Sequence, residues 1–261
     1  MSNWLTDVGA VMSRNFSRLK RSPDVIGFAL FQPLIFVRMF SQVYGGAIQV
    51  PGSNYTEFLM AGIFAQTVVF GATFSGTFMA QDLKEGIVDR FRTLPMSQAA
   101  VLFARTFTDL TINTVSMIVM LLAGLAVGWR FNDGVPKFLA GVALLLFFAW
   151  AFSWVLVFVG LVVSTPETLN NAVFIILFPL TFISNAFVPS DTLPTVLRVF
   201  AEWNPVSALV QAARSLFGNL PDGPPPDVWT MQHPVIAVLA GSVVIAAVFM
   251  PLSIARFRRR E

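Results

Sequence analysis

The stretch from Phe58 to Gln81, FLMAGIFAQTVVFGATFSGTFMAQ, contains no charged residue. An α-helix needs about 20 apolar residues to cross the hydrocarbon core of a bilayer, so this run is long enough for one crossing. Comparable runs recur along the chain, and one of them is interrupted only by Arg38. The sequence therefore predicts an all-α polytopic membrane protein with six crossings, over residues 24–44, 56–80, 99–129, 136–164, 167–188 and 232–255.

The composition of the whole chain agrees with a bilayer environment. Of its 261 residues, 56% are hydrophobic and 12% are charged, which is more apolar surface than a soluble domain of this length can bury. The chain has no cysteine, which excludes disulfides, thiolate metal sites and a cysteine nucleophile, and its single histidine, His233, cannot build a histidine metal site. The alternative, a very apolar soluble bundle, does not need such uninterrupted apolar lengths.

Lysine and arginine are distributed unevenly between the two sides of the predicted membrane. If the N-terminus is inside and the sides alternate, the inner segments hold 11 of the 17 basic residues. Because basic residues are enriched in cytoplasmic loops, this bias predicts that both termini and residues 81–97 are cytoplasmic. The formal net charge of +3 thus follows from topology and does not indicate a nucleic-acid partner.

Residues 1–22 have the pattern of a basic amphipathic helix. Trp4, Val8 and Val11 fall on one helical face, and basic residues gather toward the far end. Such a helix lies in the plane of the membrane interface. A signal peptide is the alternative, but no small-residue cleavage site follows the apolar positions. We therefore expect an N-terminal interfacial helix.

Residues 81–97 interrupt the apolar pattern with charges of both signs. In a helix over this segment, Ile87 and Phe91 would share an apolar face beside charged residues, and Pro95 would end the helix. The alternative is an ordinary solvated loop. A helix that docks on a cytosolic partner needs both features, since charges set register and apolar residues become buried. The candidate docking residues are Lys84, Glu85, Ile87, Asp89, Arg90, Phe91 and Arg92.

The outer segment 189–219 is broken by prolines at positions 189, 194 and 205. Two short amphipathic pieces follow these prolines, over 193–201 and 205–217, which predicts a re-entrant or outer-leaflet helical hairpin between the fifth and sixth crossings.

Ionisable residues inside the crossings leave alternatives open. Arg38 can extend outward to the interface or form a functional pair. Arg105 and Asp109 are four positions apart, so they can meet on one helix face, either as a structural ion pair or as a proton relay.

Motifs of covalent chemistry are absent from the sequence. There is no phosphate-binding loop of the GxxxxGK[ST] type, no HExxH, no GxSxG and no acid cluster suited to a metal ion. We therefore expect no catalytic residue and no cofactor in this chain. Uphill transport would need an ion gradient, with Arg105, Asp109 and Glu57 as candidates, or a separate nucleotide-hydrolysing subunit. A non-transporting membrane scaffold is a third alternative.

Three stretches, in this order, resemble the permease subunits of type-2 ABC exporters, in the daunorubicin-resistance branch. They are Lys84-Glu85-Gly86 with Leu94-Pro95-Met96-Ser97, then Phe178–Ser184 with Phe187-Val188-Pro189, and Asn204-Pro205-Val206-Ser207 with Ala213-Arg214. The resemblance implies that residues 81–97 form a cytosolic coupling helix. It also implies that the outer hairpin shapes an exit gate, with Phe187, Pro189, Asn204 and Pro205 as candidates.

The same resemblance implies the assembly and its location. Two six-span permeases, identical or sister chains, would pair in a bacterial cell membrane, and two ATPase subunits that bind ATP and Mg would dock beneath the coupling helices. The cargo would be an amphipathic drug, antibiotic or lipid. The second and fifth crossings would line its path, with Phe70, Phe74, Asn170, Asn171, Phe174 and Phe178 as candidates. Ordinary packing of the phenylalanines and bonds from the asparagines to a neighbouring helix are the alternatives.

Overall fold

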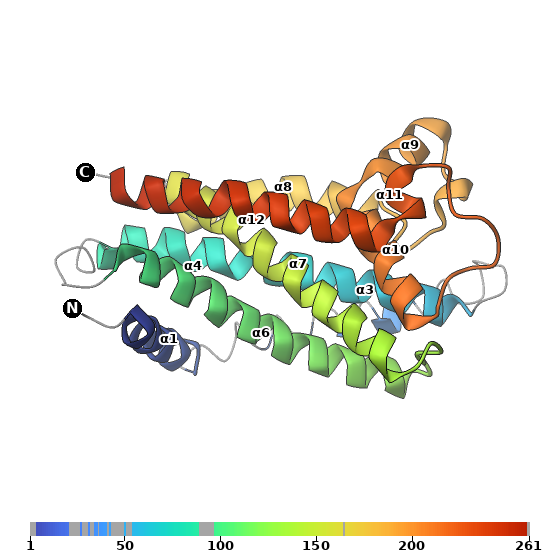
Figure 1. Cartoon of the computed structure of the whole chain (residues 1–261), viewed down its shortest axis with the longest axis horizontal. Coiled ribbons are helices and arrows are strands. Elements are labelled where there is room, and N and C mark those ends of the chain that lie inside the picture. The colour runs from blue at the N-terminus through green and yellow to red at the C-terminus, as the bar shows by residue number, and fades with distance from the viewer. Residues whose placement is uncertain are drawn as a thin grey trace.

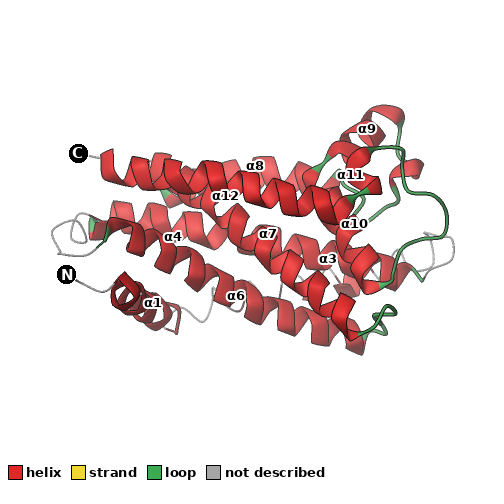
Figure 2. Ribbon diagram, in the orientation of Figure 1, coloured by secondary structure: helices red, strands yellow, loops and turns green. Residues whose placement is uncertain are grey.

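A computed structural model of the chain shows a bundle of long helices (Figures 1 and 2). It describes residues 4–20, 54–88, 97–163 and 165–259, together with positions 27, 31, 34, 35, 37–40, 42 and 50. Every secondary-structure element over these residues is helical, as the sequence predicts. The elements are α1 (Trp4–Lys20), α3 (Tyr55–Gly71), α4 (Thr73–Lys84), α6 (Gln98–Ala126), α7 (Val135–Val162), α8 (Pro166–Phe182), η1 (Ser190–Thr192), α9 (Thr195–Trp203), α10 (Pro205–Phe217), α11 (Trp229–Gln232) and α12 (Pro234–Arg259).

Four helical stretches are long and apolar enough to cross a membrane. They are Tyr55–Lys84, which joins α3 and α4, Ala99–Ala126, Val135–Val162 and Pro234–Arg258. They lie where the sequence predicts the second, third, fourth and sixth crossings. The predicted first crossing, 24–44, falls largely outside the described residues, although Arg38 is described and is exposed. The six-crossing count therefore stays a prediction.

Helix α8 is shorter than the apolar run that contains it, because side chains define both of its ends. It starts after Thr165, whose hydroxyl accepts a hydrogen bond from the backbone N–H of Thr168 at 3.2 Å. Near its other end, Asn204 Nδ2 donates to the carbonyl groups of Leu180 and Ile183, at 2.6 and 3.1 Å. Since these carbonyls are satisfied from outside the helix, α8 ends at Phe182 although the crossing is predicted to reach 188.

Helix α7 is the central helix of the bundle. It contacts α3, α4, α6, α10 and α12, and Figure 1 shows it passing between α12 and α6. Its approach to α4 is very close, since a Cβ placed on Gly160 would lie 2.5 Å from the carbonyl oxygen of Gly76. Only a residue without a side chain permits this contact, so the two glycines set the α4–α7 distance.

The main core lies toward the α10 end of the bundle, around Trp129. This side chain is fully buried, and its ring meets the edges of Phe64 and Phe217 at centroid distances of 5.0 and 5.4 Å. The indole Nε1 donates to Asn219 Oδ1 at 2.9 Å, so the one polar atom of the ring is satisfied.

The two ends of the bundle differ in content. The C-terminal ends of α4 and α12 lie together with α1 at one end, whereas α9, α10 and α11 gather at the other (Figure 1). We call these the terminal end and the hairpin end. At the terminal end, the apolar face of α1 packs on α6, where Val8 and Val11 meet Ala100 and Ala104.

Candidate functional site

A buried ionic cluster ties three helices together at the terminal end. Asp82, near the end of α4, is 3% exposed. Its Oδ2 accepts a hydrogen bond from Arg14 of α1 at 3.1 Å and another from Arg105 of α6. Arg105 is also buried, so it and Asp82 pair in a region of low dielectric, where such pairing is required, and the partly exposed Arg14 adds a second bond. We call these three residues the ionic anchor.

Arg105 has a partner that the sequence did not indicate. The spacing allows Arg105 and Asp109 to meet on one helix face, and the guanidinium bonds to Asp82 on the neighbouring helix. Asp109 is 2% exposed. It lies beside Ser75, yet among the described residues neither of its carboxylate oxygens has a hydrogen-bond partner of normal geometry. A local spacing rule could not find Asp82, which is 23 positions from Arg105 and 68 from Arg14.

A second contact from α1 reaches the start of α6. Asp7 Oδ2 accepts a hydrogen bond from the backbone N–H of Ser97 at 3.3 Å. Ser97 occupies the cap position of α6, but its own side chain makes no capping bond, so a carboxylate from another helix interacts with this helix N-terminus. Helix α1 therefore holds the chain on both sides of residues 85–96, at Asp82 and at Ser97.

The structure places three of the seven candidate docking residues. Lys84 is the last residue of α4, and its Nζ lies 3.5 Å from Glu167 Oε1 at the start of α8. Glu85 accepts a hydrogen bond from Gln81 at 2.8 Å. The chain then turns at Gly86, whose φ of +68° favours glycine, before Ile87.

The predicted segment 81–97 therefore does not begin as a separate helix, because residues 81–84 continue α4. The other four candidates, Asp89, Arg90, Phe91 and Arg92, lie outside the described residues, and their role stays a prediction.

The candidate path residues lie on three helices, with Phe70 on α3, Phe74 on α4 and the other four on α8. Asn170 Oδ1 accepts a hydrogen bond from Thr77 Oγ1 at 2.8 Å, which joins α8 to α4. Asn171 is exposed. Phe174 and Phe178 are 58% and 40% exposed on α8, whereas Phe70 and Phe74 are half-buried.

Ring contacts run along α8 from these positions. The centroids of Phe174 and Phe178 are 5.1 Å apart, and the series continues through Phe182 to Phe187. Among the described residues, no ring contact joins Phe70 or Phe74 to Phe174 or Phe178. The structure thus brings α4 and α8 together but shows no ring contact between the two phenylalanine pairs.

The candidate gate residues fix the hairpin to α8. Asn204 uses Nδ2 for the carbonyls at the end of α8, and its Oδ1 accepts from the backbone N–H of Val206 at 2.8 Å. Pro205 follows as the first residue of α10, where a proline costs no hydrogen bond. Phe187 is buried, and its carbonyl accepts from Tyr55 Oη at 3.2 Å. Pro189 is half-buried beside η1.

Arg214 is the residue at the hairpin end whose role sequence reasoning missed. It is 1% exposed. Its guanidinium donates to the carbonyls of Phe58, Asn185 and Ala186 at 2.8 to 3.3 Å and lies 3.4 Å from the centroid of the Phe58 ring. The sequence marked it only as part of the Ala213-Arg214 pair in the third resembling stretch, without indicating its hydrogen-bond partners.

Comparison of the sequence with known proteins identifies a family for this chain. The model of the ABC-2 type transporter family matches residues 6–217. The chain is 32% identical over 248 residues to the daunorubicin resistance ABC transporter permease protein DrrB1 of Streptomyces coeruleorubidus, covering 95% of this chain and 84% of the relative.

Two further relatives are more distant. The doxorubicin resistance ABC transporter permease protein DrrB of Mycobacterium tuberculosis is 25% identical over 85% of this chain and 76% of its own length. The putative transport permease ycf38 of Cyanophora paradoxa is 24% identical over 83% and 76%. With its apolar helices of membrane-spanning length, the protein is a membrane protein, and it belongs to the ABC-2 type transporter family.

Proposed function

We propose that this chain is the permease subunit of an ATP-driven exporter that moves an amphipathic drug, antibiotic or lipid out of the cytoplasm or the inner leaflet. The observation that carries the proposal is the position of the ionic anchor, which, with the Asp7–Ser97 contact, holds the chain on both sides of the charged segment. Two copies of a separate ATPase chain supply hydrolysis and bind ATP and Mg, so this chain contributes no catalytic residue. A second permease, identical or a sister chain, completes the path.

Force on the charged segment would reach three helices at once. Asp82 and Ser97 lie at the two ends of the segment, and both are bonded to α1. Movement of docked ATPase subunits at Lys84 to Arg92 would therefore displace α1, α4 and α6 together and shift the balance between inward-open and outward-open states.

The proposed orientation puts the terminal end in the bacterial cytoplasm. The excess of basic residues in the inner segments supports this orientation. The exposed phenylalanines of α8 support an apolar path at the seam with a second permease, since exposed apolar side chains suit either lipid or a partner.

Charge reversal tests the docking. The double variant Glu85→Lys with Arg90→Glu is expressed with a tag in native membranes, and the co-purifying ATPase chain is identified by mass spectrometry. We expect recovery of that chain, and its ATPase rate in the complex, to fall roughly tenfold, because interface charges would face like charges. The matched control, Asp133→Lys with Lys137→Asp, reverses an exposed pair that lies 2.8 Å apart at the hairpin end and should recover normal amounts. Equal recovery from both variants refutes docking at this segment.

A second function, ion-coupled transport, is favoured by one observation, which is the burial of Asp109 beside Ser75 without a hydrogen bond of normal geometry among the described residues. In this case a protonophore stops transport while ATP remains, and Asp109→Asn abolishes it. Transport that continues without a proton gradient but stops on ATP depletion excludes this alternative.

A further inference from the structure

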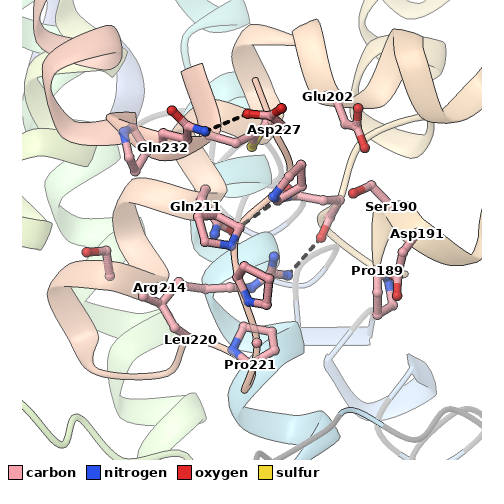
Figure 3. A pocket seen from close by; sticks show the side chains of 18 of the residues that line it. Pro189, Ser190, Asp191, Glu202, Gln211, Arg214, Leu220, Pro221, Asp227 and Gln232 are labelled. Carbon is pink, nitrogen blue, oxygen red and sulfur yellow. Dashed lines mark hydrogen bonds between the residues drawn. The ribbon is translucent and has the colours of Figure 1, made fainter. Parts of the chain in front are cut away.

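A cavity of about 460 Å³ opens at the hairpin end, within one copy of the chain. Its walls come from η1, α9, α10 and the proline-rich loop 220–227, as Figure 3 shows. Asp191 and Glu202 lie on one side of it, and Gln211 and Arg214 project from α10 on the other. The volume lies within the range of small-molecule sites, about 300 to 1,000 Å³.

The lining of this cavity carries more negative than positive charge. Four carboxylates, from Asp191, Glu202, Asp222 and Asp227, face two guanidinium groups, from Arg198 and Arg214. Arg198 donates to Glu202 at 2.8 Å, and Arg214 donates to three backbone carbonyls. With four negative and two positive groups, the lining has a formal net charge of −2, so the cavity favours a positively charged occupant.

A buried acceptor in the same wall points to a donor on that occupant. Asn185 lines the cavity and is 6% exposed. Its Oδ1 has no hydrogen-bond partner among the described residues, although its Nδ2 donates to Gln211 Oε1 at 3.4 Å. A buried carbonyl oxygen without a donor costs free energy, so a ligand that brings an N–H group would be favoured here.

The rest of the wall favours an organic cation over a metal ion. The described part of the chain brings no three histidine, aspartate, glutamate or cysteine side chains into a metal-binding group. Prolines, Leu220, Met231 and Phe58 supply apolar surface beside the carboxylates. We infer that this cavity binds a primary or secondary ammonium group carried on an apolar body.

This inference stands apart from the proposed function. Helices α9 and α10, which line the cavity, lie at the opposite end of the bundle from α1 and the C-terminal end of α4, which carry the ionic anchor (Figure 1). Occupancy of the cavity needs neither an ATPase subunit nor transport. Binding is therefore measured on the purified full chain in lipid nanodiscs with no other protein present, and failure of the docking experiment would leave this result unchanged.

Saturation-transfer NMR with three small probes tests the site. Phenethylammonium carries a charge and N–H donors, phenethyltrimethylammonium carries the charge alone, and 3-phenylpropionate carries the opposite charge. For ligands of this size we expect a Kd for phenethylammonium on the order of 1 mM. The quaternary probe should bind roughly threefold more weakly, and the carboxylate probe at least about tenfold more weakly.

Two variants separate charge from hydrogen bonding. Asp191→Asn with Asp227→Asn changes exposed side chains, leaves the Arg198–Glu202 pair intact, and should weaken binding of both cations roughly tenfold. Asn185→Leu removes the buried acceptor and should abolish the preference for phenethylammonium over the quaternary probe. Asp133→Asn, an exposed carboxylate outside the cavity, is the matched control and should leave all three affinities within about twofold.

The result that overturns the site is equally specific. Absence of saturable phenethylammonium binding up to about 20 mM, equal affinity for 3-phenylpropionate, or equal loss in the Asp133→Asn control and the double variant would each refute it. If Asn185→Leu does not fold, the double variant at exposed positions still decides the outcome.

Discussion

At the terminal end, Asp82 lies between two guanidinium groups and is almost fully buried, whereas at the hairpin end four carboxylates line an open cavity. The side-chain types are the same, but their surroundings give them opposite uses. Opposite charges that are paired in the interior fix the distance between helices, because separating them costs several kcal/mol. At the hairpin end Glu202 is paired with Arg198, but Asp191, Asp222 and Asp227 are exposed. Exposed carboxylates contribute little to holding helices together and attract an ion of opposite sign.

The largest expected effect comes from breaking the ionic anchor. Asp82→Asn removes the carboxylate and leaves Arg105 buried without it, so the free energy of unfolding should fall by about 3 to 5 kcal/mol. Chemical unfolding of the purified chain in detergent measures the change. Asp191→Asn, the same substitution at an exposed position of the hairpin end, should cost less than about 1 kcal/mol. Similar losses in the two variants would remove the contrast between the two ends.

An intermediate effect is expected where the hairpin end is fixed without charge. Asn204→Ala loses the cap of α10 and two donors to α8, which should cost about 1 to 3 kcal/mol. Asn204→Asp keeps the capping acceptor and loses only the donors. If the cap alone matters, the aspartate variant will be as stable as wild type; we expect it to be destabilised, because the carbonyls of Leu180 and Ile183 lose their partner.

The smallest expected effect on stability concerns the exposed pair at the terminal end. Lys84 and Glu167 are 3.5 Å apart and largely exposed, so Lys84→Ala should change the free energy of unfolding by less than about 0.5 kcal/mol. Raising the salt concentration should remove even that difference. A loss of several kcal/mol would mean that α4 and α8 are joined at this end more firmly than their exposed charges allow.

The sequence predicted the helices well where a helix must be apolar along its whole length to lie in the bilayer. Uncharged runs located α3–α4, α6, α7 and α12, because a bilayer crossing must be apolar throughout. Pro194 and Pro205 predicted the two short hairpin helices, since proline fixes where a helix can start. The end of α8 was not predictable in this way, because Asn204, 22 positions beyond Phe182, determines it.

The sites were less predictable than the helices because their partners are distant in sequence. Spacing rules compare residues three or four positions apart. They therefore paired Arg105 with Asp109 and could not identify Asp82 as the partner of Arg14 and Arg105. The turn at Gly86 was likewise missed, because alternating charges suggested that one helix continued through it. The role of residues 89–92 stays a prediction.

One arginine has a consequence for how the hairpin end can open. Arg214 belongs to α10, but the oxygens that receive its hydrogen bonds belong to α3 and to the stretch after α8. If α10 moved alone, the buried guanidinium would lose its hydrogen bonds to these carbonyls. Movement of all three segments together keeps the bonds and is therefore favoured. In the export cycle proposed above, a cargo would therefore leave along a seam that this side chain does not bridge.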